Sequence, residues 1–150
     1  MTAAREALIG TLRDELGERA LAFEERSERR VYIEVAAEEV PVATRLLLEE
    51  HGARFQTASG VDTPSGFEIL YHWAFDRLGL VVSLRTLLPR DEPEIESIAK
   101  LCTAAEWVER EMWELLGIRF RNHPDMRHLL LADDWPAGRH PLRRDYDGER

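Results

Sequence analysis

Apolar residues recur with the spacing of an amphipathic helix in three parts of the chain. The first part predicts a helix over residues 2–17, with an apolar stripe at Leu8, Ile9, Leu12 and Leu16. The second predicts a helix that begins at Pro41, ends before Gly52, and has Val42, Leu46 and Leu47 on its buried side. Proline suits the first position of a helix, and glycine suits the position after its last turn.

The third part predicts a helix over residues 103–116, followed by Gly117 as its stop. Thr103 and Glu106 have the spacing of a capping box, which satisfies free N–H groups at a helix start. The side expected in the core carries Ala104, Ala105, Val108, Met112, Leu115 and Leu116. The opposite side carries Glu106, Arg110, Trp113 and Glu114, whose charges are four residues apart and predict ion pairs.

Strand patterns lie between these helices. Two short apolar segments, 20–24 and 30–35, flank a charged turn and predict a hairpin. Residues 53–61, 67–75 and 80–87 are separated by short turns and predict an antiparallel meander. A short helical segment is expected over residues 95–101. The order of elements predicts a two-layer α+β domain, with helices on one face of a mixed, largely antiparallel sheet.

An extended C-terminal arm, residues 118–150, follows this body, residues 1–117. After Phe120 the arm shows neither helical nor strand periodicity, and Pro124, Pro136 and Pro141 interrupt both. It nevertheless carries large apolar side chains and arginines, the kinds of residue that concentrate binding energy at interfaces. A long segment of this kind is usually functional or a linker, and linkers are polar. We therefore expect the arm to lie along a partner.

The environment of two residues in the predicted 103–116 helix depends on what covers that helix. Trp113 is a tryptophan on the polar side, so the arm covers it, a partner covers it, or water reaches it. Glu111 lies at the edge of the apolar side, and we expect it to be partly buried and paired with an arginine of the arm.

Composition excludes several function classes. The formal charge is −9, which argues against nucleic-acid binding. Residues 1–116 hold 23 acidic and 13 basic residues, whereas residues 117–150 hold 6 and 7, so the arm differs electrostatically from the body. The single cysteine, Cys102, forms no internal disulfide and is too few for an iron–sulfur cluster. No apolar run spans a membrane and no secretory signal is recognisable, so we expect a cytoplasmic location.

Candidate chemistry is sparse. His123 and His128 with Asp125 could suggest a metal site, but their spacing is not that of a helical metal motif. No glycine-rich nucleotide loop and no nucleophile elbow occur. Glu109 and Glu111 point about 200° apart on a helical wheel, so they do not form a convergent acid pair. A small independent enzyme would have to use His123, Asp125 and Arg127 on a loop, without a nucleophile. An unrelated adaptor is a third alternative.

The C-terminal third resembles a known family, the 30 kDa subunit of respiratory complex I. The matching signature consists of Glu109-Arg110-Glu111, Glu114-Leu115-Leu116, His123, Arg127 and Leu129-Leu130. The match extends over Gly117-Ile118, Phe120, Pro124-Asp125, Asp133-Asp134-Trp135 and His140-Pro141-Leu142-Arg143-Arg144-Asp145-Tyr146. With Trp113, these residues are the expected partner interface.

The resemblance implies a non-catalytic subunit of a membrane-bound, ion-translocating redox complex. Its implied partners are a catalytic large subunit (49 kDa-like or [NiFe]) and an iron–sulfur small subunit (20 kDa-like), which this chain would clamp in fixed geometry. Iron–sulfur clusters, and quinone or a NiFe centre, would lie in those partners, with no catalytic, cofactor or metal residue here. The implied location is the cytoplasmic face of the membrane, peripheral.

The same subunit occurs in membrane-bound group 4 [NiFe] hydrogenases. Two features resemble those members: the chain stops soon after Asp145-Tyr146, and the segments 68–72 and 88–91 look like theirs. The sequence therefore leans towards the hydrogenase branch without fixing the electron donor, the acceptor or the translocated ion.

Overall fold

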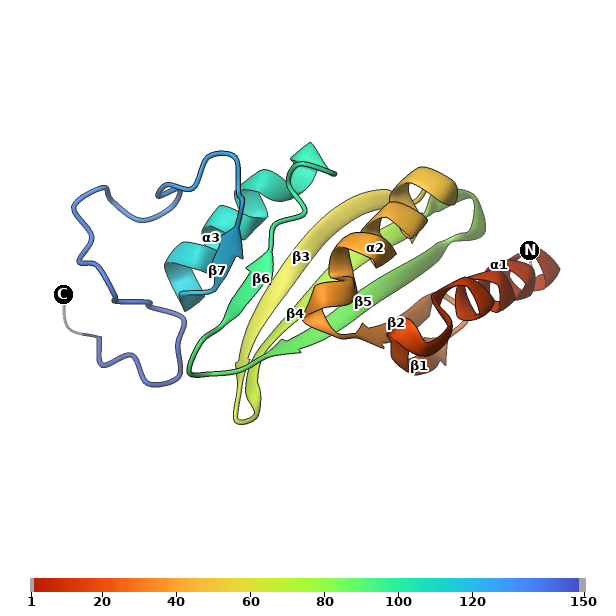
Figure 1. The fold of residues 1–150 in the computed structure, drawn as a ribbon, viewed down its shortest axis with the longest axis horizontal. Helices are drawn as coiled ribbons and strands as arrows, with labels where there is room; N and C mark the ends of the chain where they lie inside the picture. Colours follow the sequence, from red (N-terminus) through yellow and green to blue (C-terminus); the bar gives the residue numbers. More distant parts are fainter. Residues whose placement is uncertain (1, 149–150) are drawn as a thin grey trace.

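A computed structural model of the protein describes residues 2–148. In chain order its main elements are α1 (Thr2–Leu16), β1 (Ala20–Ser27), β2 (Arg30–Val35), α2 (Val40–Arg45), β3 (Arg54–Thr63), β4 (Gly66–Phe75), β5 (Leu80–Leu88), β6 (Glu94–Glu96), α3 (Glu106–Leu116) and β7 (Arg119–Arg121). A π-helical turn, Leu46–Glu50, extends α2. Figure 1 shows these elements along the chain.

The strands form a mixed sheet in the order β1-β2-β5-β4-β3. The predicted hairpin, β1–β2, and the predicted meander, β3–β4–β5, are both antiparallel, and β2 joins the two units by pairing in parallel with β5. A separate pair of short parallel strands, β6 and β7, connects the body to the start of the arm. The predicted fold class is thus confirmed.

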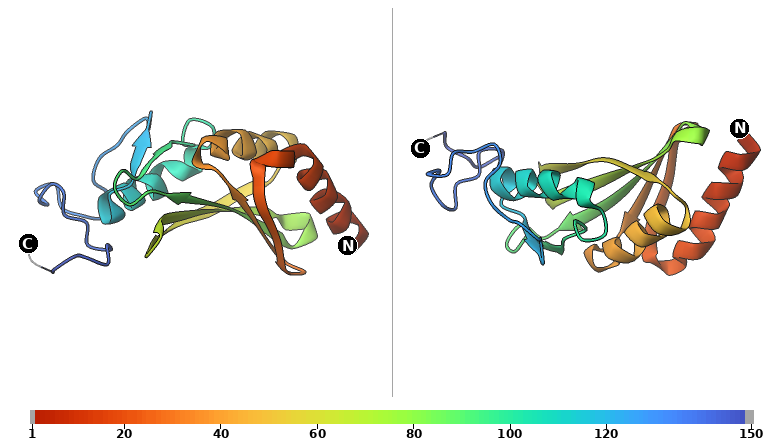
Figure 2. Two further views of the ribbon diagram at one scale, coloured as in Figure 1. Left: turned by 60° about the horizontal axis from the view of Figure 1, so that its bottom comes forward. Right: turned by 90° about the horizontal axis from the view of Figure 1, so that it is seen from above.

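Two layers hold the core between them. Helices α2 and α3 lie over the same face of the five-stranded sheet, and α1 lies at the β1 end (Figure 2). The facing strand residues are fully buried: Val31 and Ile33 of β2, Phe67, Ile69, Tyr71 and Trp73 of β4, and Leu80, Val82 and Leu84 of β5. Alternation along each strand places these side chains on one face, as the sequence pattern predicts.

The helix α3 approaches the sheet at a glycine. A Cβ added to Gly60 of β3 would lie 2.6 Å from Leu116 Cδ1 and 3.2 Å from Met112 Cγ. Glycine therefore allows α3 to pack closely over this part of the sheet.

Several local predictions are wrong. Residues 95–101 are not helical, because Glu94–Glu96 pair with β7 as strand β6. Thr103 does not cap α3: residues Thr103–Ala105 form a 3₁₀ turn, Ala105 precedes α3, and no side-chain cap bond is present. Ala104 is exposed instead of buried. Val42 is 46% exposed, because Val40 and Ala43 supply the buried side of α2.

Among residues 2–148, no helix combines the length and the apolar composition needed to cross a membrane.

Candidate functional site

Polar side chains of α3 bind the main chain of the arm and fasten it to the body. Residues 122–148 contain turns but neither helix nor strand, and they pass α3 at the end of the molecule opposite α1 (Figure 1). Tight turns shape this segment: the N–H groups of Trp135, Arg143 and Tyr146 each donate to the carbonyl three residues earlier. Because its backbone does not pair with a sheet, side chains of the body must satisfy many of its polar groups.

Glu114 is the principal anchor of the arm. Its carboxylate accepts the backbone N–H groups of Leu129, Leu130 and Leu131 at 3.0, 2.7 and 3.3 Å. The ring Nδ1 of His128 lies 3.0 Å from the same carboxylate. Burial opposes ionisation of Glu114, but these donors outweigh it and hold the pKa of the carboxyl below its ordinary value. The buried side chain therefore stays an anion that organises three consecutive residues of the arm.

Arg110 complements Glu114 one turn earlier on α3. Its guanidinium donates to the carbonyls of Arg127 and His128 at 3.0 and 2.6 Å, and the residue is only 4% exposed. The ring of Trp113 lies 5.2 Å from that of His128 and packs against the core. The arm thus contacts Trp113, which is half-buried. The polar side of the predicted helix is buried, because the arm's backbone and His128 supply its partners instead of (i, i+4) ion pairs.

The far end of the arm is fastened at the C-terminus of α3. The ring Nδ1 of His140 lies 3.0 Å from the carbonyl of Glu114, and Arg143 donates to that of Leu116 at 2.6 Å. The N–H of Leu142 donates to the carbonyl of Leu115 at 3.0 Å. These donors satisfy carbonyls that a helix end leaves free. Gly117 (φ +77°) allows this approach, since an added Cβ would lie 2.7 Å from the His140 ring.

A buried carboxylate at the tip of the β3–β4 hairpin also holds the arm. Asp62 accepts the backbone N–H of Arg144 at 2.9 Å and pairs with the Arg90 guanidinium. The hydrogen bond from Arg90 is the main cause of a lowered Asp62 pKa. The guanidinium carbons of Arg90 and Arg143 lie 5.1 and 5.0 Å from the centre of the Phe67 ring. Sequence reasoning missed Asp62 and Arg90, because Asp62 stands in a strong turn pattern that explains it locally.

Glu109 of α3 forms its hydrogen bonds with other residues of the body, not with the arm. Its carboxylate accepts the Ser97 hydroxyl at 2.5 Å and the Ile98 N–H at 2.8 Å, and the side chain is fully buried. Burial raises the pKa of Glu109 to about 7, against the opposing effect of these two hydrogen bonds. No pattern in the sequence indicated that Ser97 would be a partner of Glu109.

His123, a residue of the arm, lies against α3 next to Glu109. Its Nε2 lies 2.9 Å from the Glu106 carbonyl, and its Nδ1 accepts the Asp125 N–H at 3.1 Å. A carbonyl only accepts and an N–H only donates, so these partners place a ring proton on Nε2 and leave Nδ1 as the acceptor. The side chain is buried, and Nε2 lies 3.8 Å from Glu109.

The expected arginine partner of Glu111 is not found. Glu111 is half-buried, and no hydrogen bond or ion pair of its carboxylate is formed within residues 2–148. Glu109 and Glu114 are the buried carboxylates instead. Among the loop residues of the enzyme alternative, Asp125 pairs with Arg127 at 2.9 Å, whereas the His123 ring is engaged as described above. His128 is directed to Glu114, so the two histidines hold separate partners.

The remaining signature residues divide between the core and the surface. Phe120 is buried with Ile118, and β7 pairs with β6, so the first residues of the predicted arm pack with the body. The indole of Trp135 donates to the Arg139 carbonyl at 2.8 Å. Tyr146 lies under the Arg139 guanidinium. The remaining signature residues that are exposed or half-exposed are Pro124, Asp134, Pro141, Leu142, Arg144 and Asp145. The division at residue 117 remains a prediction.

The fold and site define a class: a two-layer α+β domain whose last helix fastens an irregular C-terminal segment through its side chains. The sequence model for the 30 kDa subunit of respiratory-chain NADH dehydrogenase matches residues 33–150, so the chain belongs to this family. The predicted resemblance is thereby confirmed.

Named relatives and solved structures agree with this assignment. One subunit of the F(420)H(2) dehydrogenase of Methanosarcina mazei is 47% identical over 94 residues, which cover 61% of this chain and 59% of that protein. One subunit of the NADH-quinone oxidoreductase of Phocaeicola vulgatus is 39% identical over 119 residues, covering 77% and 22%. The chain therefore spans less than two thirds of each of these relatives.

Two solved structures share the fold. A chain of the membrane-bound sulfane sulfur reductase, an archaeal respiratory membrane complex, superposes with a TM-score of 0.84 at 26% identity and covers 95% of this chain and 85% of its own length. A trypsin-resistant fragment of Nqo5 superposes with a TM-score of 0.66 at 20% identity, covering 80% and 97%. The relatives and the sulfane sulfur reductase chain are thus subunits of dehydrogenase, oxidoreductase and respiratory membrane complexes.

Proposed function

We propose that this protein is a non-catalytic, peripheral subunit of a membrane-bound, ion-translocating redox complex of the complex I type. It clamps a catalytic large subunit and an iron–sulfur small subunit, and it lies at the cytoplasmic face of the membrane. Electrons pass through iron–sulfur clusters in those partners towards quinone or a NiFe centre. Family membership and the superposition with a respiratory membrane complex support this proposal.

One observation carries the proposal: the arm is fixed through its main chain, while several of its large side chains face outward. Glu114 and Arg110 bind N–H and carbonyl groups of the arm, which leaves side chains free for another surface. Leu130 is 64% exposed and Leu142 is 59% exposed. Exposed leucines on a preorganised segment suit a protein interface, since little conformational freedom is lost when a partner binds.

Fixed geometry is the physical role of such a subunit. Clusters in neighbouring subunits exchange electrons only when their distances are maintained. A rigid segment that contacts two partners maintains such distances without supplying a redox group. In this proposal the arm provides the contact, and the α+β body provides the support that keeps the arm in one conformation.

The exposed leucines give a direct test of the proposal. We expect the double variant Leu130→Asp, Leu142→Asp to fold normally but to lose co-purification with the large and small subunits, because two charges enter an apolar contact. Val42→Asp is the matched control, since Val42 is also exposed but lies on α2, away from the arm. Full recovery of both partners with the double variant would show that the arm is not the docking element.

A further inference from the structure

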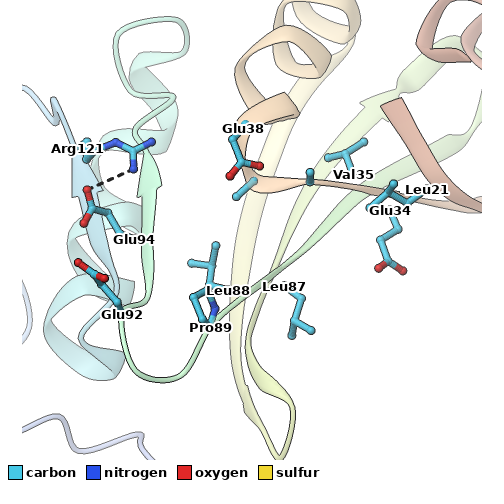
Figure 3. A pocket seen from close by; sticks show the side chains of 12 residues that line it. Leu21, Glu34, Val35, Glu38, Leu87, Leu88, Pro89, Glu92, Glu94 and Arg121 are labelled. Atoms are coloured by element: carbon cyan, nitrogen blue, oxygen red, sulfur yellow. Dashed lines mark hydrogen bonds and ion pairs between the residues drawn. The ribbon is translucent and has the colours of Figure 1, made fainter. Parts of the chain in front are cut away.

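A second surface lies where the ends of β2 and β5 meet the segment that leads to β6, and one residue of the arm, Arg121, borders it. It is a groove of about 570 Å³. In Figure 3, Leu88 and Pro89 lie in the middle of the groove, with Glu92 and Glu94 on one side, Glu34 on the other and Glu38 above. Glu94 pairs with Arg119 and Arg121 at the start of the arm, whereas the side chains of Glu34, Glu38 and Glu92 make no hydrogen bond or ion pair with the arm within residues 2–148.

The groove offers apolar contact. Leu87 is 47% exposed and Leu21 is 64% exposed, and both line it. The β1–β2 register shifts between Ala20 and Ala22, so Leu21 stands at an irregularity of the strand. Bulges of this kind re-aim a side chain. Two exposed leucines from different strands thus border one depression, which single scattered surface leucines do not do.

The groove is also strongly acidic. Its lining includes four carboxylates and one guanidinium, that of Arg121. Arg121 is engaged by Glu94 at 3.2 Å, and Glu34 reaches Arg85 at 3.5 Å. The carboxylates of Glu38 and Glu92 form no ion pair or hydrogen bond with any residue from 2 to 148. Two carboxylates, one beside the apolar strip and one above it in Figure 3, therefore remain available.

This chemistry selects among classes of ligand. Acidic side chains repel nucleic acids and anionic lipid headgroups. Among residues 2–148, no cluster of three or more His, Cys, Asp or Glu side chains could hold a metal ion, so the carboxylates are too dispersed for a single cation. Cationic groups spaced along a chain, with an apolar group between them, would fit both features.

We propose that this groove binds a basic, amphipathic segment of a neighbouring subunit, with an apolar side chain over Leu87–Pro89 and lysine or arginine side chains at Glu38 and Glu92. The inference rests on the proposed function only in requiring that the protein has neighbours in a complex. It adds an interface that does not include the exposed leucines of the arm, Leu130 and Leu142. Two separated contacts would hold the body more rigidly than the arm alone, because they prevent rotation about a single attachment.

Photocrosslinking in the assembled complex tests the proposal. p-Benzoylphenylalanine replaces Leu87 in the tagged chain, the complex is isolated in mild detergent and irradiated, and crosslinked peptides are identified by mass spectrometry. We expect a single neighbour, joined through a peptide that contains at least two lysines or arginines. Val42 is the matched control position, because it is 46% exposed and does not line the groove. We expect no crosslink to the same peptide from position 42.

Charge reversal supplies a second readout. The double variant Glu38→Lys, Glu92→Lys should lower the Leu87 crosslink yield about tenfold at physiological salt, since like charges would then face each other. Glu49→Lys with Glu50→Lys is the control, because both residues are exposed on the π-helical turn and outside the groove. Raising the salt concentration should also lower the yield for the unmodified charges.

Several results would overturn the groove interface. These are a crosslink to a peptide without basic residues, to lipid, or to a second copy of this chain, or no crosslink from position 87 while the arm-dependent partners still co-purify. Loss of all partners from the unsubstituted protein would instead refute the proposed function itself. The two failures are therefore distinguishable in one preparation.

Discussion

Glu109 provides the sharpest quantitative prediction, because its carboxyl is fully buried with only two donors. Its pKa is about 7, compared with an ordinary value of 4.5. This difference in pKa corresponds to about 3 kcal/mol of unfolding free energy. The folded pKa is raised, so the folded protein keeps a proton that the unfolded chain releases between pH 4.5 and 7. Stability from this group is present below pH 4.5, falls through that range, and stays low above pH 7.

The substitution Glu109→Gln removes the titration and keeps the shape. We expect the difference in unfolding free energy, variant minus native, to rise by about 3 kcal/mol between pH 4.5 and 8. The charge of Glu96 also raises the pKa of Glu109. Burial raises the pKa values of Tyr71 and Cys102, and the charge of Glu109 adds to this effect.

The assay is urea unfolding of the 150-residue chain at several pH values, for the native protein and for Glu109→Gln. Glu111→Gln is the control, because Glu111 is on the same helix, is half-exposed and has no partner among residues 2–148. This control shows how far the loss of one carboxyl from the helix changes the pH dependence by itself. A Glu109→Gln difference that changes with pH no more than the Glu111→Gln difference would rule out the raised pKa of Glu109, since the buried carboxyl would then titrate as it does in the unfolded chain.

Three further predictions concern the arm. Glu114→Gln should speed amide hydrogen exchange at residues 129–131 by about 10- to 100-fold, because a hydrogen bond to a charged group contributes about 1.5–3 kcal/mol. Exchange is measured by mass spectrometry, and an unchanged rate would show that Glu114 does not anchor the arm. Gly117→Ala should lower the free energy of unfolding in urea by about 2 kcal/mol, through its positive φ and its contact with the His140 ring, and an unchanged value would contradict that contact. Ending the chain after Arg121 should leave a folded body, by circular dichroism, that no longer assembles; retained assembly would exclude the arm as the docking element.

The sheet was predictable because each strand carries its own alternation and its own turn. The alternation of β4 from Phe67 to Phe75 assigns its buried face correctly, and the turn that starts at Asp62 assigns its pairing with β3. The parallel joint between β2 and β5 was not predictable, since no local pattern identifies partners far apart in sequence. The same reason explains the error at residues 95–101: β6 owes its conformation to β7.

The polar face of α3 shows where reasoning from periodicity fails. A helical wheel assigns Arg110 and Glu114 to solvent because they are charged, yet both are buried. Their partners are backbone groups of the arm, which any sequence can supply and no pattern reveals. The family resemblance singled out both residues, but it did not distinguish Glu114, which binds the arm, from Glu111, which does not.

If this protein works inside a membrane redox complex, as we propose, its partners should be recovered with it from native membranes. The tagged chain is isolated from native membranes in mild detergent, its partners are identified by mass spectrometry, and hydrogen uptake and quinone reduction are assayed. We expect a large catalytic subunit and an iron–sulfur small subunit in the preparation. A [NiFe] subunit with hydrogen uptake would identify the hydrogenase branch, and a quinone-reacting subunit would identify the complex I branch. Recovery of the chain alone, without redox partners, would contradict the proposed function.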